Sequence, residues 1–119
     1  NEILTEKGEA VRSKSEKIIA DKLYMKGIPY VYEQPLYLKG YGYVVPDFKI
    51  LNIRTRKEYY LEHFGMMDDS EYSRKALRKI ETFQKNNIFP DDNLLMTFET
   101  SDSPLNTRIL EELVKKYLV

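Results

Sequence analysis

The sequence contains no cysteine and no tryptophan, has a single histidine, and balances 19 basic against 19 acidic residues. Without cysteine it has no disulfides, no thiolate metal sites and no cysteine nucleophile, which is typical of the reducing cytoplasm, where we expect this protein. Zero net charge argues neither for nor against a polyanionic partner. The longest apolar runs are only a few residues, so we expect no membrane-spanning helix and no secretory leader.

The length of 119 residues is that of a single domain with one core. The chain begins with Asn1 rather than methionine, as a domain excised from a longer protein would. Ten residues are tyrosines, which suit both half-buried strands and base-stacking surfaces. We therefore treat residues 1–119 as one domain and keep both interpretations of the tyrosines open.

Hydrophobic periodicity and turn residues divide the chain into three helices and four strands. A helix start at Asp69 or Ser70 follows from the capping preference of these residues. The predicted helices are Thr5–Lys26, 71–87 and 101–119, and the predicted strands are 30–38, 43–51, 57–65 and 93–100. Three successive strands indicate a meander, and the helix before the last strand indicates a parallel crossover. The expected fold is α/β, with a mixed central sheet flanked by helices.

Two carboxylates lie in the predicted second and third strands, Asp47 directly after Pro46 in one and Glu62 near the end of the other. If these strands form a hairpin, side-chain alternation allows both carboxylates onto one face of the sheet. Together they repel each other and lose hydration unless a cation satisfies them, and Mg²⁺ or Mn²⁺ prefers such oxygen ligands. The alternative is a pair of strand-end carboxylates that face water. Glu16, on the Ile19 and Leu23 side of the first helix, is a candidate third ligand.

The segments "VVPDFKI" and "YYLEHFG" resemble the PD-(D/E)XK nuclease superfamily, and "RSKSE" resembles its acidic helix position. The resemblance implies a restriction-endonuclease-like fold of helix, three-strand meander, helix, strand and helix. It also implies that Asp47, Glu62 and Glu16 bind Mg²⁺, for which Mn²⁺ substitutes. The implied activity is that of a hydrolase that cleaves DNA phosphodiester bonds. The stretch "EHFGMMDD" looks like a branch that occurs as a domain of larger DNA-processing proteins, so further domains are expected partners.

The chain departs from the superfamily pattern two residues after Glu62, where the usual lysine is replaced by Phe64. The predicted second helix offers a replacement, because Lys79 belongs to an apolar stripe that should pack on the sheet. A snorkelling lysine would show the same pattern. We rank the candidate catalytic lysines Lys79, Lys49 and Lys75.

His63, the single histidine, follows Glu62 directly, and strand alternation points it to the opposite face. It is a candidate for acid–base or phosphate contact, with a structural role as the alternative. Three functional hypotheses remain. The first is a metal-dependent deoxyribonuclease, and the second is a catalytically inactive nuclease-fold module that binds nucleic acid or a partner protein. The third is a structural α/β domain in which these acidic residues have no function.

Overall fold

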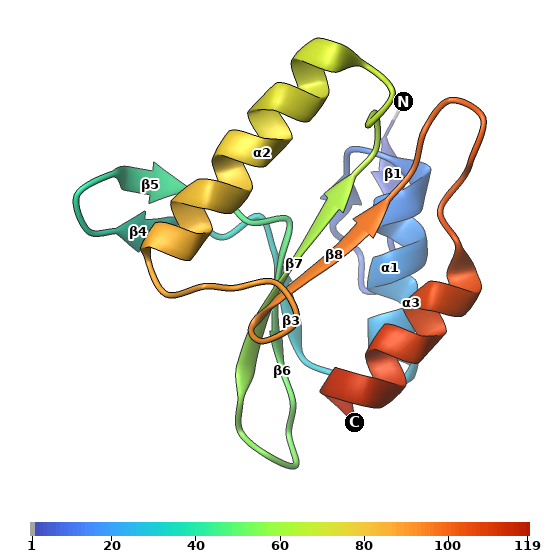
Figure 1. Cartoon of the computed structure of the whole chain (residues 1–119). Coiled ribbons are helices and arrows are strands. Elements are labelled where there is room, and N and C mark those ends of the chain that lie inside the picture. The colour runs from blue at the N-terminus through green and yellow to red at the C-terminus, as the bar shows by residue number, and fades with distance from the viewer. Residues whose placement is uncertain (1) are drawn as a thin grey trace.

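The computed structural model describes residues 2–119, which form a mixed α/β domain. Three helices and a short π-helical turn accompany eight strands (Figure 1). In chain order the elements are β1 (Ile3–Leu4), β2 (Ala10–Val11), α1 (Lys14–Met25), β3 (Tyr30–Tyr32), β4 (Leu36–Leu38), β5 (Gly42–Val44), β6 (Phe48–Leu51), β7 (Glu58–Phe64), α2 (Ser70–Lys85), β8 (Leu94–Phe98), α3 (Thr107–Leu113) and the π-helical η1 (Val114–Leu118). Within residues 2–119, no helix is both long and apolar enough to cross a membrane.

The central sheet has the strand order β3–β6–β7–β8. β6 pairs antiparallel with both β3 and β7, and β8 pairs parallel with β7 after the crossover through α2. In the β6–β7 register Phe48 lies opposite Leu61, which places the residue before β6 beside the end of β7. The predicted mixed sheet and the parallel pairing of its last two strands are therefore confirmed, but the β4–β5 hairpin interrupts the predicted meander between β3 and β6.

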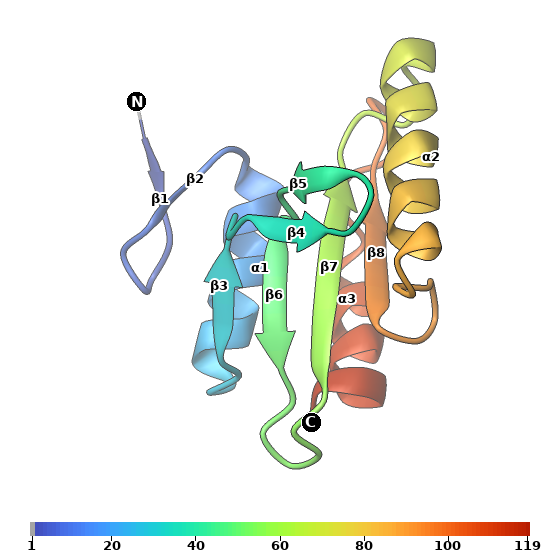
Figure 2. The same cartoon turned by 90° about the vertical axis from the view of Figure 1, so that its left-hand side faces the viewer.

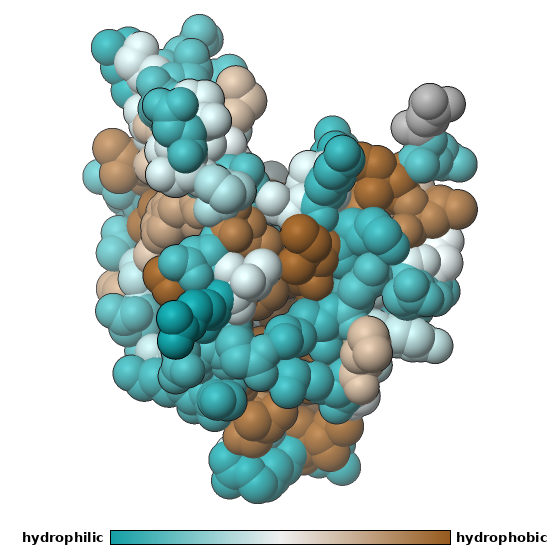
Figure 3. Space-filling model, turned by 90° about the vertical axis from the view of Figure 1, so that its right-hand side faces the viewer, coloured by the Kyte–Doolittle hydropathy of each residue, from teal (hydrophilic) through white to brown (hydrophobic). Residues whose placement is uncertain are grey.

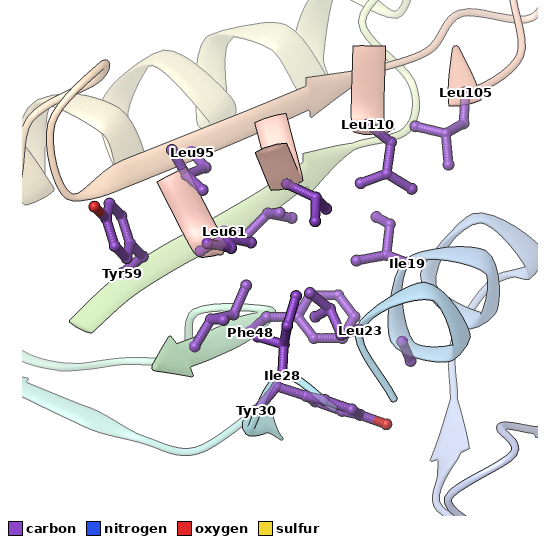
Figure 4. Packing of buried hydrophobic residues seen from close by; sticks show 14 residues of the cluster. Ile19, Leu23, Ile28, Tyr30, Phe48, Tyr59, Leu61, Leu95, Leu105 and Leu110 are labelled. Carbon is purple, nitrogen blue, oxygen red and sulfur yellow. The ribbon is translucent and has the colours of Figure 1, made fainter. Parts of the chain in front are cut away.

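Helices cover both faces of the sheet, α2 on one side and α1 with α3 on the other (Figures 1 and 2). The larger core lies beneath α1 and α3, where Ile19, Phe48, Leu61 and Leu110 are almost completely buried (Figure 4). A smaller core lies beneath α2 and centres on Phe83, which is fully buried. Each buried side chain of this size contributes about 1.5–3 kcal/mol, so both faces hold their helices firmly.

The predicted first helix, Thr5–Lys26, is wrong over residues 5–13. Thr5 instead belongs to the turn of a β1–β2 hairpin that contains Gly8, at a φ of 109° that suits glycine. The helix begins at Lys14 because the Ser13 side chain accepts a hydrogen bond from the backbone N of Glu16, which is an N-terminal cap.

The predicted strands 30–38 and 43–51 are each interrupted. The first breaks at Glu33, whose φ is 52°, shortly before Pro35. The second breaks at Pro46, which has no backbone N–H to donate to a sheet. The inner pieces β4 and β5 pair with each other in a separate hairpin, which lies on the same side of the sheet as α2 (Figure 2).

The last predicted helix, 101–119, starts only at Thr107. The Asn106 side chain caps it by accepting hydrogen bonds from the backbone N atoms of Arg108 and Ile109. The start of α2 agrees with the prediction, since Asp69 is its N-cap and accepts from the backbone N of Tyr72.

Candidate active site

Asp47 and Glu62 meet beside α2, where the chain enters β6 and where β7 ends. The backbone N of Asp47 donates to Glu62 Oε2 over 2.5 Å, and the backbone N of His63 donates to Asp47 Oδ2 over 2.8 Å. The antiparallel register of β6 and β7 produces this arrangement, because it sets the residue before Phe48 next to Glu62. The two carboxylates are thus fixed by the backbone of the sheet.

Lys79 reaches the carboxylates from α2. Its Nζ forms an ion pair with Glu62 Oε1 and donates to the backbone O of Val45 over 3.1 Å. The Glu62 side chain is only 1% exposed and that of Lys79 is 30% exposed, so the pair lies at the inner end of a cavity that opens to solvent. The lysine therefore points inward from its apolar helix face, as the interpretation of Lys79 as a replacement lysine requires.

The electrostatics of the pair favour a cation. Burial, and next the negative charge of Glu62, raise the pKa of Asp47 to about 7. Burial also raises the pKa of Glu62, although the ammonium of Lys79 opposes this rise. The single ammonium therefore leaves part of the cost of holding two carboxylates together uncompensated.

Asp47 retains a free acceptor. Oδ2 receives the His63 N–H, whereas for Oδ1 the described part of the chain provides no hydrogen bond. Among residues 2–119, every fully buried side-chain oxygen has a hydrogen-bond partner. Asp47 Oδ1 has none, so it is not fully buried and solvent can reach it. An oxygen of this kind beside a second carboxylate is a suitable ligand for a hard cation.

These donors fit Mg²⁺, which is usually held by one or two carboxylates together with water and substrate phosphates. No group of three or more His, Cys, Asp or Glu side chains gathers closely enough to hold a metal ion anywhere in residues 2–119. The fit of the site to a metal ion therefore rests on Asp47 and Glu62.

Glu16 lies near the pair but has structural contacts of its own. Its Oε1 accepts hydrogen bonds from the Arg12 backbone N, the Ser13 Oγ and the Tyr32 hydroxyl, at 3.1–3.2 Å. Its charge contributes to the raised pKa of both Asp47 and Glu62, after the larger causes. Glu16 thus belongs to the cap of α1, and its contribution to metal binding stays a prediction.

His63 faces away from the Asp47–Glu62 pair, as strand alternation predicts. Its Nδ1 lies 2.8 Å from Thr97 Oγ1 and its Nε2 lies 2.6 Å from Glu99 Oε1. Glu99 Oε1 also accepts from the Ser15 hydroxyl, so β7, β8 and α1 are joined through this carboxylate. Sequence reasoning missed Glu99 and Ser15. A signal for Glu99 was present, because the parallel pairing of the third and fourth strands places its carboxylate close to His63.

The other lysine candidates and Phe64 lie differently. Lys49 pairs with Glu58 at 3.3 Å and, in the part of the chain that the structure describes, has no ion pair with Asp47 or Glu62. Lys75 lines the same cavity as Lys79, one helical turn away. Phe64, in the slot of the usual lysine, is buried and stacks on Phe98 with ring centroids 5.6 Å apart. The side chain at this position packs against a neighbouring strand and supplies no charge to the site.

A wider groove continues from the Asp47–Glu62 pair toward the start of α1. Its volume is about 620 Å³, and Asp47, His63 and Tyr72 line both the groove and the smaller cavity of about 210 Å³ beside Lys79. Arg12, whose guanidinium forms an ion pair with Glu33 at 2.7 Å, and Lys14 also line this groove. Figure 3 shows the molecule hollowed between the α2 side and the side of the N-terminal hairpin. Sequence reasoning also missed Tyr72 as a lining residue, whose hydroxyl accepts from the backbone N of Gly65.

Comparison with known proteins gives one informative similarity, and no family model matches the chain. The chain is 34% identical over 125 aligned positions to the uncharacterized protein MJ1519 of Methanocaldococcus jannaschii. The alignment covers 94% of this chain and 10% of that protein, so the chain spans about a tenth of the relative's length. The relative's name states no activity, and the functional argument therefore rests on the site.

Proposed function

We propose that this chain is a metal-dependent nuclease domain that hydrolyses DNA phosphodiester bonds. The convergence of Asp47, Glu62 and Lys79 beside an open groove is the observation that carries the proposal. It combines two carboxylates suited to a cation, an ammonium beside them and space for a polymer, and phosphodiester hydrolysis can use all three. The resemblance of "VVPDFKI" and "YYLEHFG" to PD-(D/E)XK nucleases supports the same chemistry.

The proposed roles follow from the contacts. Asp47 Oδ1 and Glu62 would hold Mg²⁺, or Mn²⁺ in its place, and such an ion positions the scissile phosphate and lowers the pKa of a bound water. Lys79 has three N–H donors and uses two of them on Glu62 and the Val45 backbone. The third is left for a phosphate oxygen or the attacking water. Arg12 and Lys14, on the groove wall, would contact the phosphate backbone without reading sequence.

A catalytically inactive module that binds nucleic acid or a partner protein is the second candidate. Two observations favour it. Both Glu62 oxygens already have protein partners, and the slot of the usual lysine holds the buried Phe64. Under this alternative the Lys79–Glu62 ion pair is a structural replacement for a metal ion.

Cleavage assays distinguish the metal-dependent nuclease from the inactive binding module. Single-stranded, duplex and branched DNA are incubated with the protein and either Mg²⁺, Mn²⁺ or a chelator. We expect metal-dependent cleavage that falls about 10²–10³-fold in Lys79→Met, which removes the ammonium beside the phosphate, and at least as much in Glu62→Gln, which weakens a proposed ligand of the metal ion. Lys85→Met, at the far end of α2, is the matched control and should cleave normally.

Each other outcome has a clear meaning. Binding of DNA without cleavage in either metal would establish the inactive module. Cleavage that survives Lys79→Met but disappears in Lys49→Met would show that the lysine is wrongly assigned. Cleavage that survives both Glu62→Gln and Asp47→Asn would place the active site elsewhere or reveal a contaminating nuclease.

A further inference from the structure

The β4–β5 hairpin carries a cluster of exposed tyrosines that packing does not explain. Tyr37, Tyr41 and Tyr43 are 61–72% exposed. Tyr37 and Tyr43 lie opposite each other in the hairpin, with ring centroids 5.4 Å apart in an edge-to-face arrangement. The opposite face is already used, because Leu38 is buried against Phe83 in the smaller core. An aromatic surface that contributes nothing to the core is available for a ligand.

The hairpin is attached directly to the candidate active site. Lys79, which pairs with Glu62, also binds the backbone O of Val45, the residue that follows β5. From Tyr43 the chain needs only four more residues to reach Asp47, so their Cα atoms are at most ~14 Å apart. That distance corresponds to about four stacked nucleotides at ~3.4 Å each. A DNA strand bound at the candidate active site would therefore reach the tyrosines within a few nucleotides.

The charge of this segment suits a polyanion. Between Glu33 and Asp47 the sequence has no carboxylate, and its one charged residue is Lys39 in the turn. The chain as a whole carries 19 acidic residues, so a stretch free of them beside an active site is a local feature rather than a general one. Lys75, which is exposed, adds a second basic residue to the cavity beside Lys79.

We propose that the exposed face of the β4–β5 hairpin is a stacking platform for unpaired bases of a single-stranded DNA segment next to the scissile phosphate. Tyrosine rings stack on any base, so the platform selects strandedness rather than sequence. Duplex DNA keeps its bases paired inside the helix and offers no free ring faces to these side chains. The proposed nuclease then prefers single-stranded or frayed DNA. The inference rests on the proposed function in taking DNA as the ligand, but it does not require cleavage.

Binding of a fluorescein-labelled (dT)12 oligonucleotide tests the platform. Fluorescence anisotropy is measured in low salt with a chelator, so that nothing is cleaved. Base–aromatic stacking is worth ~1–3 kcal/mol, so Tyr43→Ala should weaken binding roughly 5- to 150-fold, and Tyr37→Ala should also weaken it. Tyr43→Phe keeps the ring and should bind within about twofold of the parent. Tyr24→Ala, at a half-exposed tyrosine in α1, is the matched control and should bind normally.

A tryptophan reporter makes the test more direct, because the chain has no tryptophan of its own. In Tyr43→Trp, (dT)12 should quench the fluorescence by stacking, whereas a blunt 12-base-pair duplex should not. In Tyr24→Trp neither DNA should change it. Quenching by the duplex that equals quenching by (dT)12 would contradict the preference for unpaired bases.

The inference and the proposed function fail separately. Unchanged (dT)12 affinity in a Tyr37→Ala/Tyr43→Ala double variant overturns the platform, even if the parent protein cleaves DNA. Unchanged affinity together with weaker self-association in sedimentation overturns it as well and assigns the face to a second copy of the chain. Weakened (dT)12 binding in a protein that never cleaves DNA leaves the platform standing and removes only the nuclease.

Discussion

Replacing Asp47 with asparagine should stabilise the protein at alkaline pH. Burial and the charge of Glu62 raise the pKa of Asp47 to about 7 in the folded protein, against 3.8 as its ordinary value. Between these values the folded state keeps a proton that the unfolded chain has released. The free energy of unfolding therefore falls as pH rises from about 4 to about 7 and then levels off.

The size of the effect follows from the same numbers. A pKa raised from 3.8 to about 7 corresponds to about 4 kcal/mol at most. Asparagine removes the charge and keeps an oxygen that accepts the His63 N–H, a bond of 2.8 Å in the parent. We expect Asp47→Asn to exceed the parent in unfolding free energy by about 2–4 kcal/mol at pH 8 and by less than about 1 kcal/mol at pH 4.

Urea unfolding followed by circular dichroism at pH 4, 6 and 8 measures both proteins. Asp102→Asn, at an exposed aspartate in the loop after β8, is the matched control and should differ little from the parent at any pH. A parent–variant difference that is independent of pH would refute the reasoning, as would an Asp47→Asn protein that is less stable at pH 8. Adding 10 mM Mg²⁺ at pH 8 should stabilise the parent and not Asp47→Asn, because a bound cation stabilises only the state that holds it.

Three further substitutions test the packing and the ion pair, each by urea unfolding at pH 8. Lys79→Met leaves the Glu62 carboxylate, which is 1% exposed, without its cation. The free energy of unfolding should fall by about 1–3 kcal/mol, which is less than for a fully buried pair because Lys79 is partly exposed. The loss should shrink at pH 5, since a protonated carboxyl needs no partner. Phe83→Ala empties the centre of the core under α2 and should cost about 3–5 kcal/mol. Ser13→Ala removes the cap of α1 and should cost about 1 kcal/mol, whereas Ser13→Asp should restore it.

Local patterns were sufficient for the central part of the fold. The α2 helix carries a clear apolar stripe and a capping aspartate at Asp69, and β7 and β8 are short runs rich in aromatic and aliphatic residues. Because β6 and β7 form a tight antiparallel pair, alternation alone was enough to place Asp47 near Glu62. The helical period of the apolar stripe likewise put Lys79 on the inner face of α2.

The errors arose where single residues override periodicity. Gly8 permits a hairpin turn, and Ser13 then starts α1 later than the helical pattern suggested. Glu33 and Pro46 break two apolar runs that read as continuous strands, and the tyrosine-bearing hairpin results from those breaks. Contacts between distant segments, such as that of Ser15 with Glu99, depend on the completed packing of α1 against the sheet and leave no local pattern.

The central claim is that Asp47 and Glu62 bind a divalent cation beside Lys79. A crystal structure with bound Mn²⁺, located by its anomalous scattering, tests it most directly. The account predicts one ion within about 2.0–2.3 Å of an oxygen of each carboxylate, and no such ion in Asp47→Asn crystals. Lys79 should then either have lost its ion pair with Glu62 or share the Glu62 carboxylate with the metal ion. An intact Lys79–Glu62 ion pair at saturating Mn²⁺, with no ion between the carboxylates, would contradict it.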